Sequence, residues 1–141
     1  MAKKKVFVSF DYDHDKQYKY LLEAWDANPD FEFGFTDLTP EEIQSSDVSR
    51  IKAAITAKIN QATYTLVIVG KYANSLHPKH REIGYKNWQN FEVAKSKMNR
   101  NKLVGVKIDS TNEAPEELYG AGATWASAFK QDSILNALRQ A

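Results

Sequence analysis

TYTLVIVG, residues 63–70, is an almost continuously apolar stretch that is rich in β-branched side chains and closed by a glycine. Its length is that of a strand, and it shows no alternation between polar and apolar positions. Strands of parallel sheets have this composition because helices cover them on both faces. The stretch therefore predicts the central strand of a parallel α/β sheet.

Three further segments have the composition of strands. KVFVSF, residues 5–10, and KLVGVKI, residues 102–108, are short β-branched or aromatic runs that are typical of buried strands. FEFGF, residues 31–35, alternates and contains a glutamate and a glycine, which indicates a position nearer the edge of the sheet.

Apolar residues recur at helical spacing between and after these strands. The alternation of strands and helices predicts a parallel sheet covered on both faces, which is a flavodoxin-like three-layer α/β sandwich. A chain of 141 residues is the size of one domain, so residues 1–141 are predicted to form a single domain. The predicted helices run from Lys16 to Ala27, onward from a cap at Asp47, through Glu92 to about Met98, and onward from Trp125 or Ser127.

Composition excludes several classes of function. The net charge is +1, from nineteen basic and eighteen acidic residues, so no overall field favours nucleic acid as a partner. The absence of cysteine excludes disulfides and thiolate catalysis and suits a reducing compartment. No stretch has the pattern of a signal peptide or of a membrane span. We expect a cytoplasmic protein that does not bind membranes.

Polar residues follow the predicted strands at one edge of the sheet. In open α/β sheets, ligands bind beyond the carboxyl ends of the strands, at the point where the strand order switches. The segments expected to meet there are residues 9–15, 35–37 and 70–75, together with the start of the helix that contains Glu92. This edge is therefore the predicted functional site.

KNWQNFEVAK, residues 86–95, places a carboxylate among aromatic side chains. Trp88 lies four residues before Glu92, which is about one helical turn, and Tyr85 is predicted on the same stripe. The alternative is that Glu92 is an ordinary solvent-facing residue of an exposed helix. The motif alone leaves both interpretations open.

Several enzyme chemistries lack their motif. The dinucleotide fingerprint GxGxxG and the phosphate-binding GxxxxGK[ST] are both absent. His77, His80 and Glu82 have a spacing that a metal site could use, but Pro78 lies between the histidines and no helix is predicted to align them. No metal site is predicted. The histidines are expected to be exposed or to contact a phosphate.

DYDHD, residues 11–15, contains three acids directly after the first strand. A magnesium site of the receiver type would also require an acid directly after the third strand, where Gly70 and Lys71 stand instead. The simpler interpretation is that Asp13 or Asp15 caps the first helix.

VFVSFDYDHD resembles the opening of TIR domains, in which a strand ends in a serine and an aromatic residue before an acid. The corresponding residues here are Ser9, Phe10 and Asp13 or Asp15. The run TLVIVG also resembles the buried third strand of that family.

Two later motifs occur in the order that the same resemblance requires. WQNFE resembles the TIR pattern of a tryptophan, an aromatic residue and a glutamate, here Trp88, Phe91 and Glu92. FTDLTP, with Asp37 and Pro40, lies where TIR domains have an aspartate and a proline after the second strand.

The resemblance covers most of residues 4–108 and points in particular to the TIR-like proteins of bacterial Thoeris anti-phage systems. Three departures from the family pattern stand out. Gln89 occupies the place of a cysteine, Glu41 occupies the place of a glycine, and the segment between the third strand and Trp88 is unusually long.

This resemblance implies an enzyme that cleaves the nicotinamide–ribose bond of NAD+, with Glu92 as the catalytic residue. It implies NAD+ as the substrate and no cofactor. The expected product is an ADP-ribose-derived, cyclic or conjugated signalling nucleotide that a separate effector protein senses. Self-association is a further possibility within the family. The substrate-binding residues on this interpretation are Ser9, Phe10, Asp11, Phe35, Asp37, Tyr85 and Trp88.

Two other functions fit the same resemblance. One is a non-catalytic TIR-like module that recognises a nucleotide or another TIR domain. The other is a nucleoside deoxyribosyltransferase, a related sandwich that also directs a glutamate at a ribose. This last function ranks third because its partner acids are not evident in the sequence.

Overall fold

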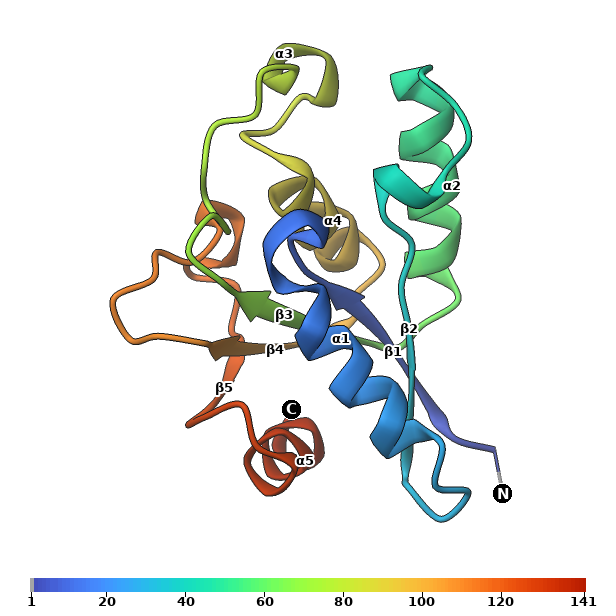
Figure 1. Cartoon of the computed structure of the whole chain (residues 1–141), viewed down its shortest axis with the longest axis vertical. Helices are drawn as coiled ribbons and strands as arrows, with labels where there is room; N and C mark the ends of the chain where they lie inside the picture. Colours follow the sequence, from blue (N-terminus) through green and yellow to red (C-terminus); the bar gives the residue numbers. More distant parts are fainter. Residues whose placement is uncertain (1) are drawn as a thin grey trace.

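The stretch that ends at Gly70 forms the middle strand of a five-stranded parallel sheet with the order β2-β1-β3-β4-β5. All six residues of β3 are buried, as its composition predicts. The computed structural model describes residues 2–141, and Figure 1 shows β3 between β1 and β4. The strands are β1 (Lys4–Ser9), β2 (Phe33–Thr36), β3 (Tyr64–Val69), β4 (Lys102–Lys107) and β5 (Thr124–Ala126).

Helices cover both faces of this sheet and give three layers (Figure 1). Apolar residues of α1 and α5 pack on one face, and those of α2 and α4 pack on the other. The predicted flavodoxin-like α/β sandwich is confirmed. The helices are α1 (Tyr12–Asp26), α2 (Val48–Asn60), α3 (His80–Ile83), α4 (Trp88–Met98) and α5 (Gln131–Gln140), with 3-10 turns η1 (Pro40–Glu42) and η2 (Glu116–Leu118).

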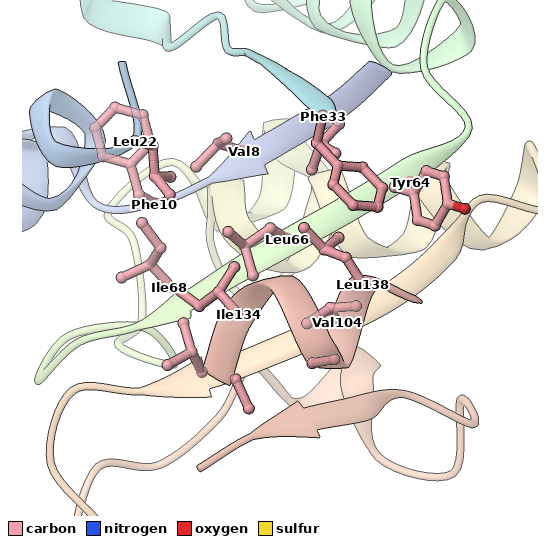
Figure 2. Packing of buried hydrophobic residues seen from close by; sticks show 14 of the residues in the cluster. Val8, Phe10, Leu22, Phe33, Tyr64, Leu66, Ile68, Val104, Ile134 and Leu138 are labelled. Carbon is pink, nitrogen blue, oxygen red and sulfur yellow. The ribbon is translucent and has the colours of Figure 1, made fainter. Parts of the chain in front are cut away.

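The larger core lies beneath α5 and α1. Figure 2 shows Ile134 and Leu138 of α5 over Leu66 and Val104 of the central strands. Each of these four side chains is fully buried, which stabilises the fold by about 1.5–3 kcal/mol per side chain relative to exposure. This packing anchors α5 on β3 and its neighbour β4.

The first helix begins earlier than the sequence predicts. It starts at Tyr12 and not at Lys16, because Asp11 caps it by accepting a hydrogen bond from the Asp13 amide at 3.2 Å. The expectation that Asp13 or Asp15 is the cap is therefore wrong. The acidic run after β1 forms the first turn of α1, where carboxylates favour the helix dipole.

The end of the chain differs from the prediction. Thr124–Ala126 is a fifth strand that pairs with β4, and α5 begins only at Gln131. The strand is short, and the Trp125 ring lies directly over the backbone of Gly105, where a Cβ would come within 2.6 Å of the ring. Packing against the neighbouring strand therefore determines that this segment is a strand. A pattern of only three residues is too short to predict it.

Other local predictions hold. Asp47 caps α2 by accepting a hydrogen bond from the Ser49 amide at 2.9 Å, and β2 lies at the edge of the sheet. The long segment between β3 and α4 is mostly irregular but contains the single turn α3. None of the helices within residues 2–141 is both long enough and apolar enough to span a bilayer.

Candidate active site

Helix α4 starts over the ends of the two strands at which the strand order switches. The chain places β2 on one side of β1 and β3 on the other. Gln89, in the first turn of α4, donates hydrogen bonds from Nε2 to the Ser9 carbonyl at 3.3 Å and to the Ile68 carbonyl at 3.0 Å. These two bonds attach the start of the helix to the ends of β1 and β3, the usual ligand-binding position of such sheets.

Glu92 faces this switch point from the second turn of α4. Its side chain is only 2% exposed, and its Oε1 accepts a hydrogen bond of 2.6 Å from the Ser9 hydroxyl. The Ser96 hydroxyl donates to the Glu92 carbonyl at 2.8 Å, which fixes the helix at this position. The interpretation of Glu92 as a solvent-facing helix residue is therefore wrong.

Burial raises the pKa of Glu92 well above its ordinary value of 4.5. The hydrogen bond from Ser9 opposes this rise, while the nearby charges of Glu41 and Asp37 add to it. Each of these effects acts on the ionised form of the carboxyl. A cation bound beside Glu92 would favour that ionised form, so the site is electrostatically suited to a positive ligand.

A pocket of about 270 Å³ opens in front of Glu92. Carboxylates line it from three elements, namely Asp11 and Asp13 at the start of α1, Glu41 in η1 and Glu92 itself. Within the described residues, no lysine or arginine lines this pocket. Its walls come from residues 10–14, 39–41, 75–78 and 87–89, together with Tyr72 and Glu92.

Asparagine side chains hold one wall of the pocket, the segment after β3. Asn87 caps α4 and donates from Nδ2 to the carbonyls of Ala73 and Ser75, each at 2.9 Å. Asn90 donates from Nδ2 to Asn74 Oδ1 at 3.0 Å. These bonds attach an otherwise irregular segment to the helix that contains Glu92.

An ion cluster holds the opposite wall, the segment between β2 and α2. Lys19 Nζ of α1 lies 3.1 Å from Asp37 Oδ2 and 3.7 Å from Glu42 Oε2. The Thr39 hydroxyl donates to Glu42 Oε1 at 2.8 Å. Burial, together with the Glu42 carboxyl, raises the pKa of Asp37 to about 6, and Lys19 opposes this rise.

The structure brings together five of the eight predicted site residues. Phe10, Asp11, Trp88 and Glu92 line the pocket. Ser9 lies behind it and contacts the pocket through its hydrogen bond to Glu92. These residues come from β1, α4 and the segment between β1 and α1, which are the elements that the motif order singled out.

Phe35, Asp37 and Tyr85, which were predicted as substrate contacts, do not line the pocket. Phe35 is half-buried and packs against the core, with its ring centre 5.9 Å from that of Phe31. Asp37 faces Lys19 and affects Glu92 only through its charge. Tyr85 precedes α4 and so lies off the predicted helical stripe, where it packs edge-on against buried core residues.

Three aromatic residues that line the pocket, Tyr12, His14 and Tyr72, were not among the predicted site residues. His14 and Tyr72 line it with their ring centres 4.2 Å apart. His14 Nδ1 also lies 2.7 Å from Asp11 Oδ2. A correct start for α1 would have indicated His14, since residues three apart on a helix share a face. No motif marks Tyr72.

His77 lines the pocket, whereas His80 begins the short helix α3. Burial lowers the pKa of His77, and the charge of Lys79 adds to this effect. Across residues 2–141, no group of three or more histidine, aspartate or glutamate side chains is arranged to hold a metal ion.

A parallel sheet of this order is that of flavodoxin-like α/β domains, and here a buried glutamate lies at its switch point. The sequence profile of the family described as "Thoeris protein ThsB, TIR-like domain" matches residues 7–113, which is most of the chain. The chain therefore belongs to the Thoeris ThsB TIR-like family. No sequence among curated proteins matches it.

Two solved structures share the fold at low sequence identity. A prokaryotic SEFIR domain is similar with a TM-score of 0.55 and 12% identity, over 98% of this chain and 95% of that domain. The 2-desoxiribosyltransferase from Leishmania mexicana is similar with a TM-score of 0.51 and 13% identity, over 75% of this chain and 65% of that enzyme. At these identities the likeness extends to the fold alone.

Proposed function

We propose that this protein cleaves the nicotinamide–ribose bond of NAD+, with Glu92 as the catalytic residue. The observation that supports this proposal is the buried Glu92 carboxyl, which is held by Ser9 and faces a pocket. In the reaction, the bond between the ribose C1′ and the pyridinium nitrogen breaks, and its electron pair goes to the ring. Nicotinamide then leaves as a neutral molecule, so no general acid is required.

The Glu92 carboxylate acts on the ribose. As the bond breaks, positive charge moves from the pyridinium ring to C1′ and the ring oxygen of the ribose. A preorganised carboxylate in a site shielded from water stabilises this charge more strongly than it does in solution. Burial deprives the ionised Glu92 carboxylate of hydration, which raises its pKa and strengthens its attraction for a neighbouring positive charge.

The fate of the ADP-ribosyl cation decides the product. Attack by water gives ADP-ribose, and attack by a hydroxyl or ring nitrogen of the same molecule gives a cyclic form. We propose an ADP-ribose-derived signalling nucleotide, made in the cytoplasm and sensed by a separate effector protein. Membership of a Thoeris family supports this part of the proposal.

The test is nicotinamide release from NAD+ by the purified protein, alone and with extract of phage-infected cells, with products identified by mass spectrometry. Glu92→Gln removes the charge at constant shape and is expected to reduce release by about 100-fold or more. Glu82→Gln, at an exposed residue of α3, is the matched control and is expected to keep full activity. Release that is equal in both variants would refute the proposal.

A folded protein that releases nicotinamide under neither condition would favour a non-catalytic TIR-like module. The same assay tests the third function if a deoxyribonucleoside and a free base replace NAD+. Exchange of the base would indicate a deoxyribosyltransferase, the activity that the similar Leishmania mexicana enzyme is named for.

A further inference from the structure

Tyr72 and His14 form an aromatic pair on the wall of the Glu92 pocket. Their ring centres are 4.2 Å apart with the planes tilted by 37°, and both residues line the pocket. Asp11 orients His14 through the 2.7 Å contact, so the pair is preorganised. Tyr72 is 41% exposed, which leaves ring surface open to a ligand.

The Tyr72 ring is already near a cation in the structure. Lys71 Nζ lies 5.7 Å from its centre, within the range of a cation–π contact. Lys71 is exposed, so its flexible side chain can give way to a bound ligand. The ring is therefore placed to contact positive charge.

The charged side chains that line the pocket around the pair are carboxylates. Asp11 and Asp13 from α1 and Glu41 from η1 all line the same pocket. Burial raises the pKa of Glu41, and the charges of Asp13 and Asp11 add to the rise, which indicates that these carboxylates face one another. Such a site attracts a cation and repels a diphosphate.

Size limits what the pocket holds. Its volume of about 270 Å³ lies below the roughly 300–1,000 Å³ of sites for drug-sized ligands. A dinucleotide is larger than such a ligand, so only one half of it fits. If Glu92 acts on the nicotinamide ribose, the half inside is the nicotinamide half, and the diphosphate and adenosine stay outside the acidic walls.

We propose that Tyr72, supported by His14 and flanked by Asp11, Asp13 and Glu41, forms a cation-selective seat for the pyridinium ring. This inference rests on the proposed function, because it names the residues of the same site that bind the leaving group, nicotinamide. The seat binds the positively charged ring of NAD+ and discriminates against the neutral ring of NADH. Its weaker affinity for a neutral ring favours release of the nicotinamide product after the bond has broken.

The test compares two small probes of similar shape. 1-Methylnicotinamide carries the pyridinium charge, and nicotinamide does not. Their dissociation constants are measured by NMR titration against the wild-type protein, Tyr72→Ala, Tyr72→Phe and Asp13→Asn. Because neither probe contains a ribose, the measurement is independent of catalysis.

The wild-type protein is expected to bind 1-methylnicotinamide about tenfold more tightly than nicotinamide. Tyr72→Ala is expected to reduce this preference to less than about threefold, whereas Tyr72→Phe keeps the ring and the preference. Asp13→Asn is expected to weaken binding of the charged probe and to leave that of nicotinamide unchanged, with an effect that salt diminishes.

Equal affinity of the wild-type protein for both probes would refute the proposed pyridinium seat. A preference for the charged probe that survives in Tyr72→Ala would also refute it. Failure of the seat and failure of the proposed function are distinguishable. Glu92-dependent release of nicotinamide without a cation preference refutes the seat alone. A cation preference that depends on Tyr72, in a protein that releases no nicotinamide, supports the seat and refutes the catalytic proposal.

Discussion

Gly70 lies directly beneath a buried carboxyl, and replacing it with alanine tests this contact. A Cβ on Gly70 would lie 1.9 Å from Asp15 Oδ2, 2.6 Å from its Cγ and 2.7 Å from its Oδ1. Real Cβ atoms essentially never approach other atoms below 3.0 Å, so the Asp15 side chain must move. Asp15 is 6% exposed and lies against Gly70, which leaves its side chain little room to move.

The size of the effect follows from this geometry. Overpacking of a buried site typically costs about 1–3 kcal/mol, and we expect Gly70→Ala to lower the free energy of unfolding by that amount. Gly70 does not have a positive φ, so alanine adds no backbone strain. Asp15→Ala removes the Oδ1, Oδ2 and Cγ atoms that the new Cβ would meet. In this background, Gly70→Ala is expected to change the free energy of unfolding by less than about 0.5 kcal/mol.

Urea unfolding monitored by tryptophan fluorescence measures all four proteins of this double-mutant cycle. With a denaturant dependence of about 1–3 kcal/mol per molar urea, a loss of about 2 kcal/mol moves the midpoint by about 1 M. Gly105→Ala, which would push a Cβ into the Trp125 ring, is the control and should be destabilised equally in both backgrounds. If Gly70→Ala lowers the free energy of unfolding equally with and without the Asp15 side chain, the contact is refuted.

Three further changes test the site and its support. Ser9→Ala removes the hydrogen bond that lowers the pKa of Glu92, so the acid limb of the pH–rate profile for nicotinamide release should move to higher pH; an unmoved limb would contradict the contact. Burial raises the pKa of Asp15 from 3.8 to about 6, so the folded protein holds this proton more tightly than the unfolded chain and loses stability as the pH rises from about 4 to about 6. Asp15→Asn should therefore gain up to about 3 kcal/mol relative to the wild-type protein between pH 4 and pH 7 in urea unfolding, whereas a constant difference would refute this. Lys19→Met leaves Asp37 without its cation, so amide hydrogen exchange in residues 37–42 should accelerate, and unchanged exchange would show that Lys19 does not hold this segment.

The parts of the fold that the sequence predicts are those with strong local patterns. The apolar run of β3 and the cap at Asp47 each determine their element through nearby residues. The strand Thr124–Ala126 depends on pairing with β4 and on the Trp125 contact with Gly105, which are distant in the chain. Such tertiary effects override local propensity.

In the candidate site, too, local patterns predict some residues and not others. Glu92 and Trp88 are predictable because they share one helix and a recognisable spacing. Phe35 was expected in the site only because it ends a strand, but its half-buried side chain packs against the core. Tyr72 comes from an irregular segment that distant asparagines hold in place, so no local pattern identifies it.

The crystal structure of Glu92→Gln soaked with NAD+ tests most directly whether Glu92 acts on the ribose. The nicotinamide half is expected inside the pocket, with the ribose C1′ within about 4 Å of the residue 92 side chain and the ring against Tyr72. The diphosphate should lie outside the acidic walls. NAD+ bound with its adenosine half in this pocket, or bound away from residue 92, would refute the assignment of Glu92 as the catalytic residue.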